Sequence, residues 1–474
     1  MKRFLLLAAL LLPAAASAQT YNFDTYLPTE AGDFDTVADR QAAYGDGHGI
    51  AVDKDGKIWL TPFFATDSVQ VNDIDGEFYS TRVIYVFNAD GTEASISPIK
   101  FLDYPDSSRD TLGGFVIRNT DGNLAWEGKS NRGLRTSVDG ETIYASSFDF
   151  IHAIDAATGD GLAKIRIEEY CSATQVATDT DGRVYTKSVC PGSPINIYDE
   201  GLNFLSTAVA ESSNFSRSMQ VSPDGLTLFE TDFENPYTIV HTRPNTLTTS
   251  FDSVGVTFRG MRTESTDYHP TTGNLWVSSG NPLNGINDNP EVATTWEQQT
   301  WYEFRPEDLF DGDGNVVADP VPVGSFTMQV DFGVGTTDGA RPRGLDFSPD
   351  GNTAYVATFA NNGGAVGFQP AFQKLVAGPI STEDNPQLAG DLAQNQPNPF
   401  VGETTIRFAL DAPSQVSLAV YDMTGRQVAT LVDAQLPAGD HAEVFRAEGL
   451  ANGIYVYRLT VDGETSSRRM LIMR

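Results

Sequence analysis

Short runs of alternating apolar and polar residues, each closed by a turn pair, follow one another along most of the chain. One phrase recurs: an apolar alternation, then Asp-Gly or Thr-Gly, then a second β-branched or aromatic run. Its copies lie at residues 49–60, 133–145, 175–185, 219–229, 260–277 (a looser copy) and 344–356. A period of two bounded by turn residues predicts strands joined by tight hairpins, so the sequence indicates an all-β protein.

The spacing of these phrases predicts a β-propeller. The turn glycines are Gly56, Gly140, Gly182, Gly225, Gly273 and Gly351, and most steps between them span 42 to 48 residues, enough for one four-stranded blade. The wider first gap holds a half-motif at residues 120–124 and an insertion near 65–80, and the last holds an inserted arm at about 282–320. We expect six blades, with seven as the alternative, because a closed ring buries the face that each repeat leaves exposed.

The repeated phrase resembles the gluconolactonase-like, NHL and streptogramin-lyase-like propellers over residues 47 to about 375, most closely at 49–63. The resemblance implies a fold and no particular activity. In the gluconolactonase-like family an Asn and a later Asp hold a metal. Here Arg217 stands at the Asn position of the fourth copy, whose Asp232 is kept, and Arg343 and Thr358 occupy both positions of the last copy. His48 replaces the acidic residue of the first blade, so that metal chemistry does not transfer.

The last eighty or so residues form a separate strand pattern, with alternation at 405–408, 416–421, 441–445 and 454–459. Ordered motifs run through it: Pro397-Asn398-Pro399-Phe400, Val420-Tyr421-Asp422, Gly425-Arg426, Leu436-Pro437-Ala438-Gly439, Gly453-Ile454-Tyr455 and Arg469-Met470-Leu471. Together they resemble the type A C-terminal sorting domain of the bacterial type IX secretion system. The resemblance implies a small Ig-like β-sandwich that engages the secretion machinery and directs the protein to the outer-membrane surface or the medium.

The N-terminus predicts export as well. Lys2-Arg3, an apolar run over residues 4–12 and Ala16-Ser17-Ala18 form a secretory signal with a small-residue cleavage site. No later apolar stretch is long enough for a transmembrane helix. We therefore expect a signal peptide at 1–18, a propeller at 19–378, a linker at 379–391 and the sorting domain at 392–474.

Charge and cysteine content narrow the partners and the compartment. A net charge of −32 argues against nucleic acid as a binding partner, because its phosphates need a basic face.

The two cysteines, Cys171 and Cys190, bracket one hairpin. Their numbers sum to 361, as do those of Asp179 and Gly182 at its turn, so a two-residue turn would place the thiols opposite each other. In an oxidising compartment we expect a disulfide, with two free buried thiols as the alternative.

The candidate binding site comes from a position seven residues before the Asp of each Asp-Gly. It holds His48, Arg132, Thr174, Arg217 and Arg343, and the looser fifth copy offers Arg259. In a propeller this position begins the innermost strand, so these residues would ring one mouth of the central channel. Guanidinium groups suit carboxylate, sulfate or phosphate. The alternative is that each arginine pairs with an aspartate of the next blade.

A second cluster, Asp311, Asp313 and Asn315 with Asp319 beyond, resembles the front of a calcium loop, since oxygens at positions 1, 3 and 5 suit Ca²⁺. Position 12 is Pro322 instead of the bidentate Glu, and an acidic hairpin tip is the other interpretation.

Three functions stay open. The first is a binding propeller for an anionic glycan or peptide at the channel mouth. The second is a lyase or hydrolase acting there on a uronate-like substrate, with His48 as acid or base. The third is a surface scaffold without a small-molecule site.

Overall fold

The computed structural model describes residues 21–29, 47–63, 66–72, 74–167, 172–280, 296–297, 299–328, 341–359, 371–377, 392, 395, 400, 402–410, 412–422, 426–447, 449–450, 453–461 and 464–472. Over these residues the protein is almost entirely β, the one helical element being the short 3₁₀ turn η1 (Pro306–Leu309). No helix in this part of the chain is long and apolar enough to cross a membrane.

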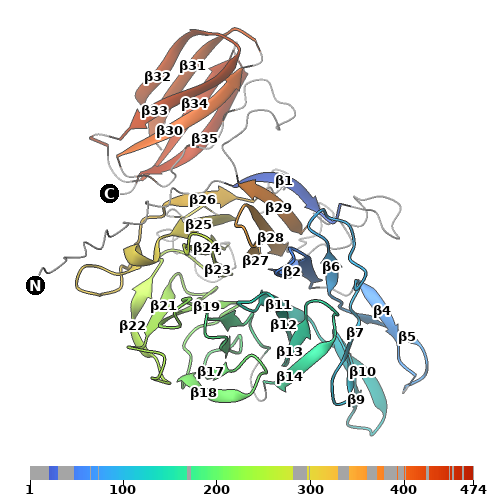
Figure 1. The fold of residues 1–474 in the computed structure, drawn as a ribbon. Coiled ribbons are helices and arrows are strands. Elements are labelled where there is room, and N and C mark those ends of the chain that lie inside the picture. Colours follow the sequence, from blue (N-terminus) through green and yellow to red (C-terminus); the bar gives the residue numbers. More distant parts are fainter. Residues whose placement is uncertain are drawn as a thin grey trace, which may run out of the picture.

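Most strands form small antiparallel sheets arranged around a centre in a propeller-like ring (Figure 1). The first sheet joins β2 (Gly47–Val52), β3 (Ile58–Pro62) and β6 (Tyr85–Phe87). The next two comprise β11 (Asn131–Thr136), β12 (Thr142–Ser147), β13 (Phe150–Asp155) and β14 (Gly161–Arg166), then β15 (Ala177–Thr178), β16 (Val184–Thr186), β17 (Ile195–Tyr198) and β18 (Phe204–Val209).

The remaining sheets of the ring follow the same order. They comprise β19 (Met219–Val221), β20 (Thr227–Glu230), β21 (Thr238–Thr242) and β22 (Asp252–Thr257), then β23 (Thr266–Tyr268), β24 (Leu275–Ser279), β25 (Thr300–Phe304) and β26 (Gly324–Thr327). The last sheet has the order β1-β29-β28-β27 and contains β27 (Arg341–Phe347), β28 (Thr353–Phe359), β29 (Phe372–Ala377) and β1 (Tyr21–Leu27). The N-terminal strand therefore completes the sheet made by the end of the ring, with Leu27 opposite Phe372.

Three two-stranded hairpins lie between β3 and β11 in sequence. They pair β4 (Asp67–Gln70) with β5 (Phe78–Thr81), β7 (Phe101–Asp103) with β8 (Arg109–Thr111), and β9 (Gly114–Arg118) with β10 (Leu124–Gly128). They account for the wide first gap between the repeated glycines, which the sequence assigned to an insertion and a half-motif.

The core of the ring is divided among the interfaces between neighbouring sheets. Each buried cluster in the described part of the ring draws on two adjacent sheets; Trp59, for example, packs in one cluster with Leu134 and Ile143 of the next sheet. Near the centre the inner strands approach so closely that a Cβ on Gly49 would lie 2.7 Å from the Leu134 backbone nitrogen. Glycine is needed there because no side chain fits between the two strands.

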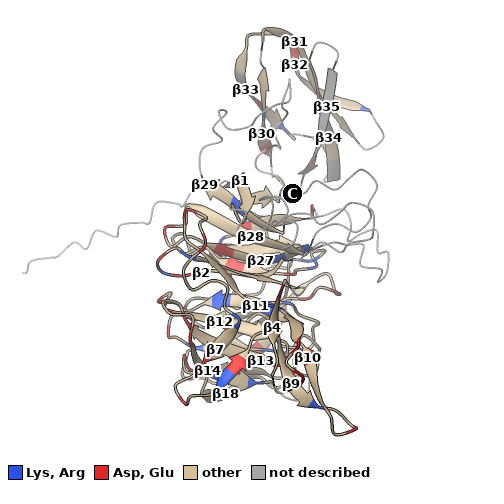
Figure 2. Cartoon of the chain, turned by 90° about the vertical axis from the view of Figure 1, so that its right-hand side faces the viewer, with Lys and Arg blue, Asp and Glu red and all other residues tan. Residues whose placement is uncertain are grey.

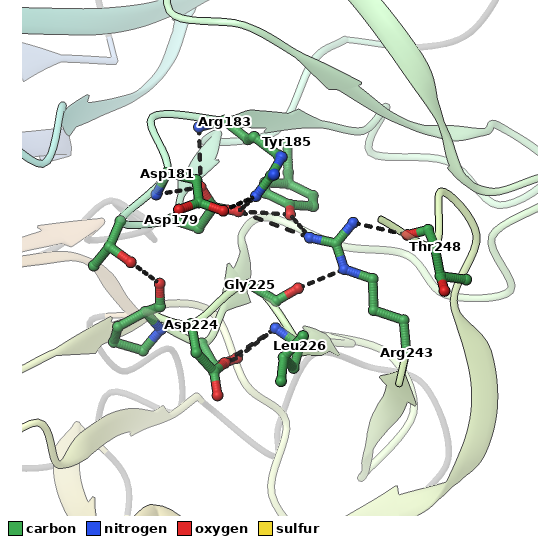
Figure 3. A network of polar contacts seen from close by, with 12 residues as sticks. Asp179, Asp181, Arg183, Tyr185, Asp224, Gly225, Leu226, Arg243 and Thr248 are labelled. Carbon is green, nitrogen blue, oxygen red and sulfur yellow. Dashed lines mark hydrogen bonds and ion pairs between the residues drawn. The ribbon is translucent and has the colours of Figure 1, made fainter. Parts of the chain in front are cut away.

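Polar networks also join adjacent sheets at their turns. In Figure 3 the buried Arg243 donates from Nε to the Gly225 carbonyl (2.7 Å), and from Nη2 to Tyr185 Oη (2.8 Å). Tyr185, in the sheet next to that of Arg243, in turn donates to Asp179 Oδ2 (2.8 Å) at the turn of its own sheet. Acidic and basic residues both occur along the strands and turns of the ring (Figure 2).

The register of the cysteine hairpin differs from the prediction. Ala177 pairs with Tyr185 and Thr178 with Val184, one residue away from the expected register, because the turn contains three residues after Asp179. Farther from the turn the strands follow the predicted register, since Ala173 pairs with Ser188. Cys190 is disulfide-bonded. Its expected partner Cys171 lies outside the described residues, so the pairing stays a prediction.

The C-terminal strands form two further sheets. β30 (Glu403–Leu410) pairs with β33 (Gly439–Arg446), and the other sheet has the order β32-β31-β34-β35, containing β31 (Ser414–Asp422), β32 (Gln427–Leu436), β34 (Gly453–Val461) and β35 (Glu464–Ile472). Their inward side chains form a separate hydrophobic cluster around Phe408, Leu418 and Tyr457. The expected strands are thus present, with β32 and β35 in addition. The predicted signal peptide (1–18) and linker (379–391) lie outside the described residues.

Candidate functional site

One position recurs near the start of each inner strand of the ring, five residues before the residue that opens the following turn. The turn-opening residues are Asp53, Ser137, Asp179, Ser222, His269 and Ser348, whose carbonyl oxygens accept the backbone N–H of the turn glycines. Counting back five gives His48, Arg132, Thr174, Arg217, Glu264 and Arg343. We call these six residues the mouth residues. The repeat therefore holds in the structure, and four of the five charged residues expected from the sequence are among them.

A β-bulge positions three of the mouth residues. The pairing of the first two strands shifts by one residue between Gly47 and Gly49, between Asn131 and Gly133, and between Pro342 and Gly344. The residue skipped in each case is His48, Arg132 or Arg343. A bulge leaves the extra residue unpaired and bends the strand, so its side chain is re-aimed. The same local device thus directs side chains from different sheets to one end of the channel.

Arg259 does not join the other predicted residues. It is exposed in the turn after β22, where its backbone N–H donates to the Ala318 carbonyl (3.2 Å) and its carbonyl accepts the Trp296 Nε1–H (2.8 Å). The fifth turn contains one residue more than the third, because the Gly273 N–H reaches back four residues to His269. A count of seven residues back from Thr272 would therefore have fallen on Ser265, one residue past the mouth residue of this copy, which is the buried Glu264. Arg259 was predicted because it precedes Gly260, as Arg132 precedes Gly133.

His48 and the three arginines among the mouth residues each lie against an aromatic ring at or just after the end of the second strand. Arg217 Cζ is 4.2 Å from the centroid of Phe233, and Arg343 Cζ is 5.0 Å from that of Phe359. Phe63 stacks on His48 with centroids 5.3 Å apart and lies 5.4 Å from Arg132 Cζ. Such cation–π contacts orient a guanidinium and leave its N–H groups available. The sequence carries a signal for these rings, an aromatic residue seven or eight positions after the turn glycine.

The arginines differ in their partners. Arg343 Nη1 lies 2.8 Å from Glu264 Oε2, and both side chains are almost fully buried. Within the described residues, Arg132 and Arg217 form no ion pair, and the Nε of each is buried without a hydrogen-bond acceptor. The Nε of Arg343 is likewise buried without an acceptor among the described residues. Pairing between sheets therefore accounts for one arginine, while the half-buried Arg132 and Arg217 have no carboxylate partner in this part of the chain.

Electrostatics show that the mouth residues converge. Burial lowers the pKa of Arg132 to about 10, and the charges of Arg217 and Arg82 add to the effect. Burial and the surrounding cations lower the pKa of Arg343 to about 9, against the attraction of Glu264. The pKa of His48 is held well below its usual value by burial and by Arg343, Arg132 and Arg217. At neutral pH the imidazole is therefore uncharged and the arginines remain cationic.

The predicted calcium-loop residues lie at the tip of a hairpin in which Phe310 bridges to Val316. Asp311 Oδ1 accepts the backbone N–H groups of Asp313 (3.0 Å) and Asn315 (2.8 Å), and the Asn315 side-chain amide donates to the same carboxylate. Asp319 is exposed further along the arm. The described residues contain no group of three or more His, Cys, Asp or Glu side chains arranged to hold a metal ion. The contacts are those of an acidic hairpin turn.

Comparison with known proteins identifies the tail. Residues 396–473 match the family described as the secretion system C-terminal sorting domain, which indicates export to the cell surface or secretion through the type IX system. No curated protein sequence matches the chain.

Similar solved structures include a chain of a mitotic checkpoint complex (12% identity, TM-score 0.37, covering 80% of this chain and 99% of that one). They also include a protein from Lactobacillus plantarum (11% identity, TM-score 0.39, covering 84% and 88%). At these scores neither likeness carries an argument about activity.

Proposed function

We propose that the protein is a six-bladed β-propeller, exported by an Ig-like sorting domain, that binds an acidic glycan through the mouth residues. Arg132 and Arg217 carry the proposal, because each is a half-buried arginine whose buried Nε has no hydrogen-bond acceptor and which forms no ion pair among the described residues. Burying a cation without a partner costs free energy, and an anionic ligand would offset that cost. A uronate carboxylate matches the paired N–H groups of a guanidinium.

The aromatic rings strengthen the case for a sugar ligand. Phe63, Phe233 and Phe359 lie beside the cations, so the mouth combines charge with apolar surface. Ligand sites commonly have this composition, a few placed polar groups on an apolar lining. An acidic peptide offers the same carboxylates and is the second ligand class to test.

The test is binding of oligogalacturonate to the mature chain, measured by calorimetry at fixed salt, with a neutral oligosaccharide of equal length as control. We expect the acidic oligosaccharide alone to bind, and Arg217→Met to weaken it at least about tenfold, since a charge-assisted hydrogen bond is lost. Arg183→Met is the matched control, because Arg183 pairs with Asp179 and Asp181 at a turn. No binding of acidic oligosaccharides or acidic peptides would leave the scaffold interpretation.

His48 supports a second candidate function, that of a lyase acting at the same site. Its imidazole is uncharged and its buried Nδ1 has no hydrogen-bond partner among the described residues. The neutral imidazole has a free nitrogen to accept the proton next to a carboxylate neutralised by the arginines, as a uronate lyase requires, although its lowered pKa makes it a weaker base than a free histidine. If His48→Gln abolished formation of an unsaturated product while oligogalacturonate binding persisted, the protein would be a lyase.

A further inference from the structure

The inner strands carry a second layer of side chains, three residues beyond the mouth residues. It consists of Ala51, Arg135, Ala177, Gln220, Asp267 and Asp346. A cavity of about 720 Å³ opens at the turn end of the channel, and the four polar members of this layer line it. The turn residues Asp53 and Asp139 contribute to its rim. This cavity is separate from the mouth residues, none of which lines it.

The hydrogen-bond donors on the cavity floor are already used. Arg135 donates from Nη1 to Asp267 Oδ1, from Nη2 to the Thr266 carbonyl (3.1 Å) and from Nε to the Val176 carbonyl (3.3 Å). Gln220 Nε2 donates to the same Asp267 Oδ1 (3.1 Å). The floor therefore has few donors left for an anionic ligand.

An acceptor is left over. Asp267 Oδ1 accepts hydrogen bonds from Arg135 Nη1, from Gln220 Nε2 and from the Tyr268 backbone N–H (2.8 Å). Asp267 Oδ2, in contrast, is buried and receives no hydrogen bond from any described residue. The Asp267 residue is only 6% exposed. Asp346 Oδ2 accepts the Val52 N–H (2.8 Å) and the Thr136 hydroxyl (3.3 Å). Once Asp346 is ionised, two carboxylates against one guanidinium leave an excess of negative charge beside an unsatisfied carboxylate oxygen.

We propose that this cavity binds a cationic group, a guanidinium or primary ammonium, which donates to Asp267 Oδ2 and completes the charge balance with Asp346. Apolar rim residues, Val138, Pro223 and Pro349, provide contact for an aliphatic stem on such a group. A basic side chain has this combination of head and stem. The proposal does not depend on the acidic-glycan site, which lies among other residues.

The protonation of Asp346 gives the binding a pH signature. Burial and the nearby Asp267 raise its pKa to about 7, against the attraction of Arg135. The other titratable or charged groups lining the cavity are Asp53, Lys54, Asp139, Tyr268 and His269. Burial also raises the pKa of Asp267, against the attraction of Arg135. Because a bound cation favours the ionised carboxylate, affinity should rise between pH 6 and pH 8.

The experiment titrates the mature protein with N-acetyl-arginine amide and with its neutral isostere N-acetyl-citrulline amide, by calorimetry at pH 6 and pH 8. We expect the arginine compound to bind at least about tenfold more tightly than the citrulline compound, and more tightly at pH 8. Asp346→Asn should remove the preference and its pH dependence while keeping the Arg135–Asp267 pair. Asp121→Asn, in the exposed β9–β10 turn, is the control and should change neither.

Equal binding of the two compounds, or an unchanged preference in Asp346→Asn, would overturn the proposal. Asp267→Asn gives a second check, read only if its unfolding curve matches that of the parent. Arg217→Met should leave arginine-amide binding unchanged, so failure of this proposal and failure of the glycan proposal are distinguishable.

Discussion

Arg217 and Arg343 occupy the same position in two repeats, yet their removal should have different consequences for stability. Replacing Arg343 with Met leaves Glu264 buried with its ion-pair partner removed, and breaking such a pair costs about 3 to 5 kcal/mol. Replacing Arg217 with Met removes a cation that burial and Arg341 disfavour and that Glu264 and Glu234 favour. It also loses the contact with Phe233, about 0.5 to 2 kcal/mol, while Met keeps most of the apolar packing. We expect Arg217→Met to stay within about 1 kcal/mol of the parent.

The assay is urea unfolding followed by tryptophan fluorescence. All five tryptophans, Trp59, Trp126, Trp276, Trp296 and Trp301, precede the sorting domain, so the signal reports the ring alone. A saturating ligand at a hundred times its Kd would add about 2.7 kcal/mol to the parent and much less to Arg217→Met. If Arg217→Met were destabilised as strongly as Arg343→Met without ligand, both arginines would serve as structural pairs and the case for an anion site would fail.

The remaining predictions concern export, oxidation and pH. Deleting residues 392–474 should leave a folded protein in the periplasm, because that segment has its own hydrophobic cluster; wild-type amounts at the surface or in the medium would contradict this. Without reductant, the denatured mature protein should react with no thiol reagent, whereas two reactive thiols would exclude the Cys171–Cys190 bridge. Asp346 has a folded-state pKa of about 7 against a lower unfolded value, so the native state binds more protons between about pH 4 and 7 and loses stability as pH rises through that window. Asp346→Asn should flatten this part of the stability profile, measured by urea unfolding at several pH values.

Sequence periodicity was sufficient to locate the inner strands, because each copy couples a period-two alternation to a glycine with positive φ, as at Gly56 and Gly351. It failed in the looser fifth copy. There the prediction followed the pair Arg259-Gly260, which resembles Arg132-Gly133, and so fell five residues before Glu264. In the tail, β32 was missed because it is an edge strand with Val432 as its only fully buried described side chain, and a strand exposed on both faces lacks the alternation that marks a half-buried one.

The second layer of side chains could not be predicted from the sequence, for a different reason. Arg135, Asp267 and Asp346 lie in repeats far apart in the chain, and no local pattern shows that a ring brings them together. The equivalent positions of other repeats hold Gln220 and Ala51, which are uncharged, so the repeats show no common residue type at this position. Aligning the repeats shows which positions are equivalent in different sheets. It does not show which side chains meet across the channel, because that depends on how the ring closes.

The pairing of β1 with β29 sets the order in which the protein can mature. Residues 21–27 are synthesised early, whereas their partners at 372–377 are made shortly before the tail. Pairings so distant in sequence form slowly, since a long loop must close before any contact stabilises it. Until then the last sheet lacks its outer strand and the ring stays open. Closure of the ring therefore has to wait until residues 372–377 have been made, when most of the chain has already been synthesised.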